Sequence, residues 1–359
     1  MHKLTFRNNN SFFYNTLKAN VDQYFLQQQR KKTGNWQLYL KTAILISGAV
    51  ILYISLLKFS YTPVTGILMS GALGFVLAAI GFNVMHDACH GSYSGRRWVN
   101  EILGLTLNAL GGNSFIWKQK HNILHHTYTN VDGIDDDIAK SPVIRQCETQ
   151  QWLPVHRIQH FYLPIVYAIL SFTWIFIMDF VKYFSKKIYT TPLQRMTAKE
   201  HFIFWVTKLL YLVFYIFIPV SFVGWESWLV GFAVMHVVFG FTMAIVFQLA
   251  HVVEHMEFES ASEDPKEIEI EWAVYQVRTT ANFAPGNKIL SWFVGGLNYQ
   301  IEHHLFPRIS HVHYPALSKI VKEACKNFNL EYNQFPTMWA AISSHFRVIK
   351  SLGRKPVLA

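Results

Sequence analysis

Nine of the 17 histidines in this chain lie in four short clusters. The clusters read HDACH, HNILHH, HVVEH and QIEHH, and their histidines are His86, His90, His121, His125, His126, His251, His255, His303 and His304. Imidazole is a neutral ligand that suits iron, copper, nickel and zinc. Nine histidines are too many for one metal ion and suit two. The clusters therefore predict a two-metal enzyme.

Three clusters carry two histidines four residues apart, and two carry adjacent histidines. On an α-helix, side chains at i and i+4 lie on one face, about 5–6 Å apart at Cβ, so both can reach one metal centre. Consecutive helical residues point about 100° apart, which suits a pair that bridges two metals. The alternative is a set of purely structural histidines, which fits one isolated pair better than four sets.

The type of ligand also restricts the chemistry. Carboxylate-bridged di-iron bundles use Glu together with Glu-x-x-His pairs, and this chain shows no such pattern. Hydrolytic zinc sites need about three protein ligands and a water. A histidine-rich two-iron site instead predicts activation of O2 and attack on an unactivated C–H bond.

The elements that position the histidines are predicted to be membrane helices. Hydrophobic residues make up 51% of the chain and charged residues 15%, against about 25% charged residues in soluble domains. A spanning helix needs about 20 apolar residues. The runs at 41–59, 64–85, 208–223 and 228–250 predict an all-α integral membrane protein with four spans in two hairpins.

Charge predicts the orientation of these spans. Seven Lys and Arg residues precede or open the first span against Asp22 alone, which places the N-terminus in the cytoplasm. If the fifth apolar run, 161–181, crossed the membrane, His251 would emerge opposite His86. We therefore expect a re-entrant or interfacial segment there, with both termini and the active site cytoplasmic. The expected domains are a cytosolic segment 1–40, a membrane domain 41–314 and a cytosolic helical segment 315–359.

Other features of the chain add detail. The net charge of +10 fits contact with anionic membrane lipids, or a docking face for an acidic redox partner, and we expect no nucleic-acid partner. The three cysteines have no paired spacing, which excludes a disulfide framework.

The acidic run after the second cluster, TNVDGIDDD, could supply metal ligands, but hydrogen bonds to the far side of the histidine rings are favoured. Asp87, Asn122, Asp136 and Gln300 are the candidates for such outer or water-mediated roles.

The clusters resemble the three histidine boxes of membrane fatty acid desaturases. HDACH, HNILHH and QIEHH match H-x3-H, H-x3-HH and Q-x2-HH, and GGLNYQIEHHLFP is highly specific to that family. Gln300 at the first position of the third box is typical of the front-end branch, which inserts a double bond between an existing one and the carboxyl end. The stretch RTTANF at 278–283 also fits. The resemblance covers roughly residues 81–314.

The resemblance implies a ligand set and a reaction. The histidines of the three boxes match family ligands, and His255 matches an extra ligand after the fourth span. His251 then stands where related acyl-CoA desaturases have a water-mediated Asn, and Gln300 replaces a histidine and could hold a water. The implied reaction uses two irons and O2 to place a cis double bond in a fatty acyl chain carried by CoA, a carrier protein or a lipid. We expect the bond near the fifth or sixth carbon.

The chain departs from eukaryotic front-end enzymes in one respect. It has no HPGG haem motif, and about 40 residues before the first span are too few for a fused cytochrome b5. We therefore expect a bacterial type in the cytoplasmic membrane, with a separate ferredoxin or cytochrome b5 as electron donor. Two rival functions remain: a hydroxylase, ketolase or acetylenase with the same site, and a non-enzymatic metal-binding membrane protein.

Overall fold

The computed structural model is mostly helical and describes residues 4–7, 11–139, 141–261 and 267–356. Within these residues, four helices are long and apolar enough to cross a membrane: Trp36–Lys58, Pro63–His90, Ala198–Val223 and Trp225–His251. They correspond to the four predicted runs. The third begins ten residues before the predicted start at 208, because Thr197 and Glu200 form a reciprocal N-terminal cap.

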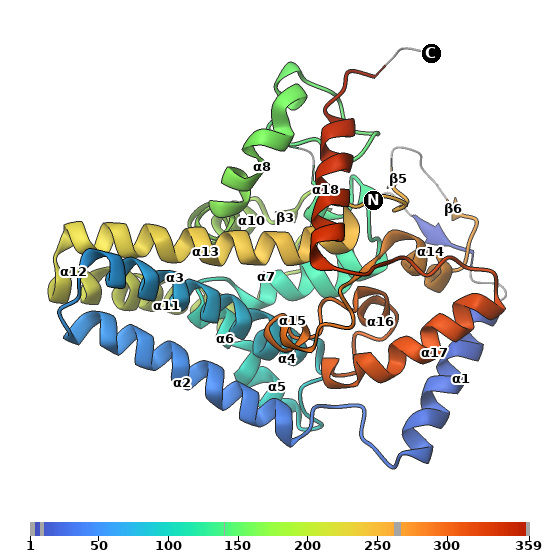
Figure 1. Ribbon diagram of the computed structural model, residues 1–359, viewed down its shortest axis with the longest axis horizontal. Coiled ribbons are helices and arrows are strands. Elements are labelled where there is room, and N and C mark those ends of the chain that lie inside the picture. The colour runs from blue at the N-terminus through green and yellow to red at the C-terminus, as the bar shows by residue number, and fades with distance from the viewer. Residues whose placement is uncertain (1–3, 8–10, 140, 262–266, 357–359) are drawn as a thin grey trace.

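Two of these helices form the centre of the membrane part. Helix α3 (Pro63–Ile80) packs along α13 (Trp225–His251) and, on its other side, along α2 (Trp36–Lys58), as Figure 1 shows. The contact between α3 and α13 is close enough to require glycine. A Cβ atom on Gly74 would lie 2.3 Å from the carbonyl oxygen of Met235. The third span runs through α11 (Ala198–Leu212), the π-helix η6 (Val213–Phe217) and α12 (Ile218–Val223).

The fifth apolar run forms a broken helix. Its halves, Pro154–Ala168 and Leu170–Ser185, meet at 60°. The break packs on α13, where a Cβ atom on Gly240 would lie 2.7 Å from the oxygen of Ala168. A bent helix of this kind is either a broken span or a re-entrant segment, so its topology stays a prediction. The pieces are η4 (Pro154–Ile158), α8 (Gln159–Ala168), α9 (Leu170–Thr173), η5 (Trp174–Met178) and α10 (Asp179–Ser185).

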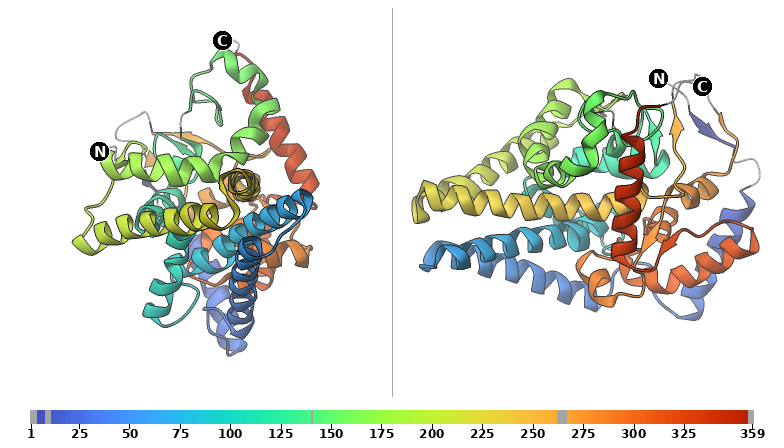
Figure 2. Two further views of the ribbon diagram at one scale, coloured as in Figure 1. Left: turned by 90° about the vertical axis from the view of Figure 1, so that its left-hand side faces the viewer. Right: turned by 45° about the horizontal axis from the view of Figure 1, so that its top comes forward.

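The remaining helices gather at one end of the long helices, as Figure 2 shows. Helix α1 (Phe12–Gln27) packs on α17 (Tyr314–Asn327), and α18 (Met338–Leu352) crosses the end of α13. The others are the π-helix η1 (Gly81–Met85), α4 (His86–His90), α5 (Arg97–Gly104), α6 (Thr106–Ala109), α7 (Ser114–Lys118), the π-helix η2 (Gln119–His125), η3 (Asp136–Ile138), α14 (Trp272–Thr279), α15 (Lys288–Phe293), α16 (Gln300–Leu305) and η7 (His311–His313).

Strands are minor in the described residues. Four ladders of two residues each are found, and three of them join segments that are far apart in the sequence. Three are parallel and one, between β3 and β4, is antiparallel. The pairs are β1 (Thr5–Phe6) with β6 (Glu267–Ile268), β2 (Val131–Asp132) with β5 (Glu259–Ser260), β3 (Lys187–Ile188) with β4 (Thr191–Pro192), and β7 (Asn282–Phe283) with β8 (Gln334–Phe335). The predicted helical class is therefore confirmed, with short strand pairs added.

Candidate metal centre

Eight of the nine predicted histidines form one buried cluster, and none of the eight is more than 8% exposed. In each of two all-histidine groups the ligand nitrogens lie within 4.8 Å of one another, and a third group of this kind adds Asp137 to His121 and His125. The first group is His86, His90, His121 and His303, and the second is His125, His251 and His304. The His126 ring lies between them, with its centroid 4.5 Å from that of His303 and 4.4 Å from that of His304. Two groups in contact predict two neighbouring metal ions.

Unpaired ring nitrogens show that these residues fit metal ions. Buried polar atoms in proteins are nearly always hydrogen bonded. Among the described residues, seven rings of the cluster each have one buried nitrogen without a hydrogen-bond partner: Nε2 of His86, His90, His125, His251, His303 and His304, and Nδ1 of His126. So many unpaired lone pairs in one place match a site for cations that histidine prefers, such as iron.

Two π-helices set the direction of the first two clusters. The second span changes from α3 to η1 directly before His86, and η2 carries the second cluster. Such turns are rare and often mark functional sites. The His121 and His125 rings remain stacked, with centroids 5.1 Å apart. His121 belongs to the first all-histidine group and His125 to the second, and the two also form a group with Asp137, so the second cluster connects the two halves of the site. The α-helix that we predicted for this cluster is wrong in detail.

His255 is a correction to the predicted ligand set. Helix α13 ends at His251, so the i, i+4 geometry assumed for this pair does not exist. The chain turns at once, His255 takes a left-handed φ of 71°, and its side chain is exposed. The turn is held by α18, where His345 Nδ1 donates to the oxygen of Val252 at 2.6 Å. His251 joins the cluster and His255 does not.

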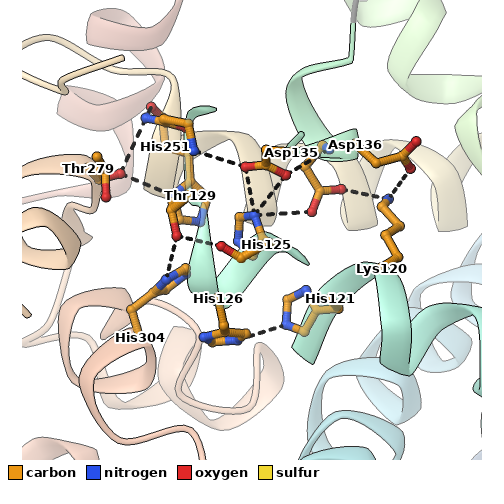
Figure 3. A network of polar contacts seen from close by, with 12 residues as sticks. Lys120, His121, His125, His126, Thr129, Asp135, Asp136, His251, Thr279 and His304 are labelled. Carbon is orange, nitrogen blue, oxygen red and sulfur yellow. Dashed lines mark hydrogen bonds and ion pairs between the residues drawn. The ribbon is translucent and has the colours of Figure 1, made fainter. Parts of the chain in front are cut away.

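Hydrogen bonds on the far side of the rings fix their orientation. His125 Nδ1 lies 3.0 Å from Asp135 Oδ2, and His251 Nδ1 donates to the oxygen of Thr279 at 3.2 Å (Figure 3). His303 Nδ1 lies 3.0 Å from the hydroxyl of Tyr314, and His304 Nδ1 lies 2.9 Å from Gln276 Oε1. A partner at Nδ1 holds the proton there and turns Nε2 toward the metal, as in many histidine-ligated sites.

The local electrostatics keep the ligands in the right protonation state. Metal binding requires neutral imidazole. Burial holds the pKa of four rings well below the usual histidine range, namely His121, His126, His303 and His304. Burial alone would also lower the pKa of His125, but the Asp135 carboxylate offsets it and raises that pKa. The carboxylate makes His125 the most basic of these five rings.

The predicted outer residues have different outcomes. Asp136 contacts lysines, with Lys182 Nζ at 2.5 Å, whereas its neighbours Asp135 and Asp137 are the ones that face His125. Asn122 donates to the backbone oxygen of Cys89 at 2.9 Å and so ties the second cluster to the first.

The other two outer residues are buried. Asp87 is next to His86 and accepts a hydrogen bond from Ser310. Gln300 begins α16, and its Nε2 atom has no partner among the described residues.

Sequence reasoning missed several contributors. Gln276 and Thr279 lie on α14, where no periodic signal marks them. Glu302 lies beside His303 and accepts from Asn282 Nδ2 and the Tyr332 hydroxyl, both at 2.8 Å. Burial raises the pKa of Glu302 to about 7. The stretch RTTANF, which contains Asn282, was the one available signal for this support of α16.

A sequence model of the fatty acid desaturase family matches residues 59–336, more than half of the chain. This chain belongs to the fatty acid desaturase family. The desaturase is 36% identical over 352 residues to the sn-1 linoleoyl-lipid 6-desaturase of Synechocystis sp., covering 95% of this chain and 96% of that protein. It is 34% identical to the enzyme of that name from Arthrospira platensis, covering 96% and 93%.

The match to a plant relative covers a smaller share of that protein. The desaturase is 36% identical to the acyl-lipid (8-3)-desaturase of Physcomitrium patens, covering 96% of this chain but 72% of that protein. Together these matches confirm the resemblance to front-end desaturases that the histidine boxes indicated. They also exclude the non-enzymatic rival, because the family and the named relatives are enzymes.

The two histidines of HVVEH provide a direct test of the ligand set. We expect His255→Ala to keep its metal and its activity, because this side chain is exposed and outside the cluster. His251→Ala should weaken metal binding by more than the roughly 10–100-fold that loss of an outer partner costs. Metal content and turnover of the two purified variants are the measurements. Equal loss of metal in both variants would contradict the corrected set.

Proposed function

We propose that the desaturase uses two irons and O2 to insert a cis double bond into a fatty acyl chain held by a membrane lipid. We place the new bond on the carboxyl side, at the fifth or sixth carbon. The observation that carries the proposal is the pair of buried histidine groups with unpaired ring nitrogens. The names of the relatives, two linoleoyl-lipid 6-desaturases and an acyl-lipid (8-3)-desaturase, support the lipid-bound substrate, and the two 6-desaturases support the position.

The proposed residues would hold the two irons with histidine alone. The ligands would be His86, His90, His121, His125, His126, His251, His303 and His304. When bound, the irons supply O2 activation and the removal of two hydrogens from the acyl chain. Gln300 is proposed to hold a water in place of a ninth histidine, because its amide nitrogen is buried and has no hydrogen-bond partner among the residues that the structure describes.

Apolar residues around the histidines would exclude water from the reaction site. Trp117 stacks on His121 with centroids 4.3 Å apart, and Phe247 lies 6.0 Å from the same ring. Met85, Cys89 and Leu107 complete a buried apolar group with Trp117. Removing water from such a site strengthens electrostatic interactions and prevents side reactions. An apolar acyl chain is the kind of substrate that suits these apolar surroundings.

Electrons are proposed to come from a separate ferredoxin or a cytochrome b5-type protein. Desaturation takes two electrons from a donor for each double bond formed, in addition to the two that leave with the substrate hydrogens. The net charge of +10 favours an acidic donor.

We also propose that the metal centre and both termini face the cytoplasm, with the broken helix re-entrant. Contacts at its two flanks support this arrangement. Gln150, before the broken helix, and Tyr189, after it, both donate to Asp132 Oδ1, at 3.4 Å and 3.2 Å. Further along, the backbone nitrogen of Gln194 donates to Gln119 beside the second cluster at 2.7 Å. A segment whose ends meet at one aspartate returns to the side from which it entered.

Lipid analysis in a host that lacks desaturases tests the reaction. Cells fed saturated and unsaturated acids in parallel should gain a cis double bond at the fifth or sixth carbon, with unsaturated chains preferred. The His304→Ala variant is the matched inactive control. A product that gains an oxygen would make the enzyme a hydroxylase. Unsaturation only at the ninth carbon or near the methyl end would refute the position.

Cysteine labelling tests the topology. The native Cys89, Cys147 and Cys325 are buried, so an introduced cysteine reports alone. We expect Lys186→Cys to be protected from an impermeant reagent in intact cells and Thr62→Cys to react, because they lie on opposite sides. Both positions are exposed. Reaction at position 186 from outside would show that the broken helix spans the membrane.

A further inference from the structure

A second buried group of charges lies beside the metal centre and shares no residue with it. It consists of Lys41, His311 and Asp87, which are 8%, 4% and 1% exposed. Lysine and aspartate are almost never buried unless they are paired. The three residues come from the first span, the segment after the fourth histidine cluster, and the first cluster. This chain of contacts therefore joins parts that are far apart in the sequence.

Lys41 is fully hydrogen bonded. Its Nζ atom lies 2.8 Å from Asn83 Oδ1, 3.1 Å from the oxygen of Trp292 and 3.2 Å from His311 Nε2. An ammonium group has three protons to donate and no acceptor. Three acceptors at these distances match that number, so the contacts describe a charged lysine that holds three segments together.

His311 connects this charge to Asp87. Because Lys41 donates to Nε2, the imidazole proton belongs on Nδ1, which lies 3.0 Å from Asp87 Oδ2 in an ion-pair contact whose angle is not that of a hydrogen bond. A neutral ring therefore lies between an ammonium and a carboxylate. The same carboxylate oxygen accepts from Ser310 Oγ at 2.7 Å and from the backbone nitrogen of His311 at 3.3 Å. Asp87 thus fixes this segment against the residue next to His86.

Asn83 extends the network into the π-helix that precedes the first cluster. Its Nδ2 atom donates to the oxygens of Ala79 and Phe293, each at 2.8 Å. A π-helix has one extra residue in its turn, which rotates all that follows by about 100°. This rotation decides which face of α4 carries His86 and His90. Lys41 holds the Asn83 oxygen, so it acts on the element that aims these two rings.

We propose that Lys41 is a positioning residue for the first metal group, acting through Asn83 on one side and through His311 and Asp87 on the other. The inference rests on the proposed metal centre but not on the identity of the product. Within the part of the chain that the structure describes, Lys41 donates to Asn83, Trp292 and His311, and none of these is a proposed ligand. Its role is to hold the first cluster and the segment after the fourth cluster in one fixed relation.

Cobalt titration of the metal-free enzyme in detergent tests this role without any need for turnover. Wild-type protein should bind two Co2+ ions with separable visible spectra. Lys41→Met should weaken one ion by roughly 10–100-fold, the range for loss of an outer partner, and leave the other unchanged. Lys208→Met is the matched control. Lys208 is also a buried lysine of a span, and it pairs with Asp179 at 2.8 Å.

Substitutions at His311 keep the test decisive if Lys41→Met fails to fold. His311→Gln can still accept from Lys41 and donate to Asp87, so it should bind both ions nearly as wild type does. His311→Leu cannot bridge them and should repeat the selective loss. Wild-type-like titration of folded Lys41→Met or His311→Leu would overturn the proposal, as would equal weakening of both ions in the Lys41 and Lys208 variants. Failure of the wild-type enzyme to bind two ions would instead refute the metal centre itself.

Discussion

The structure depends on the burial of eight imidazole rings whose free nitrogens face one another. Uncompensated burial of polar atoms is unfavourable by roughly 1–3 kcal/mol for each group. Seven such nitrogens in one cluster therefore oppose folding unless cations bind among them. The helices, caps and glycine contacts of this enzyme hold the rings together against that cost. The geometry of the centre is therefore a property of the whole assembly, and metal binding and folding must be coupled.

Three kinds of contact provide the necessary rigidity. The spans approach at backbone distance where glycine permits it, as at Gly74 and Gly240. Polar partners such as Asp135 and Gln276 fix the far nitrogens of the rings. Buried charges join segments that carry ligands, as the Lys41 network does beside the first cluster. The glycine contacts place the helices that carry the rings, the polar partners set the ring tautomers, and the buried charges set the direction in which the rings point.

The sequence predicted the parts of this site that rest on local pattern. Apolar runs of spanning length and the histidine boxes are local signals, and they led to the right helices and to eight histidines that form one buried cluster. The prediction that His255 joins the cluster is wrong because its i, i+4 spacing from His251 matters only if helix α13 continues. Long-range contacts with α18 instead hold the chain in a turn there. The prediction that Asp136 faces a histidine is wrong by one position, because a run of three aspartates does not show which one faces the cluster.

Other features could not have been predicted from pattern. The π-helices have no clear sequence signature, so the turn geometry of the first two clusters could not be predicted. Lys41 counted only as one of several positive charges before the first span. Its contact with His311, 270 positions away, depends on how all the segments at this end of the molecule pack together.

Iron analysis of the purified enzyme, combined with X-ray absorption at the iron edge, tests the central claim most directly. Protein expressed in iron-replete medium should hold two irons per chain, with a coordination shell dominated by imidazole nitrogen and with a second iron nearby. One iron per chain, or a shell dominated by carboxylate oxygen or thiolate sulfur, would contradict the account.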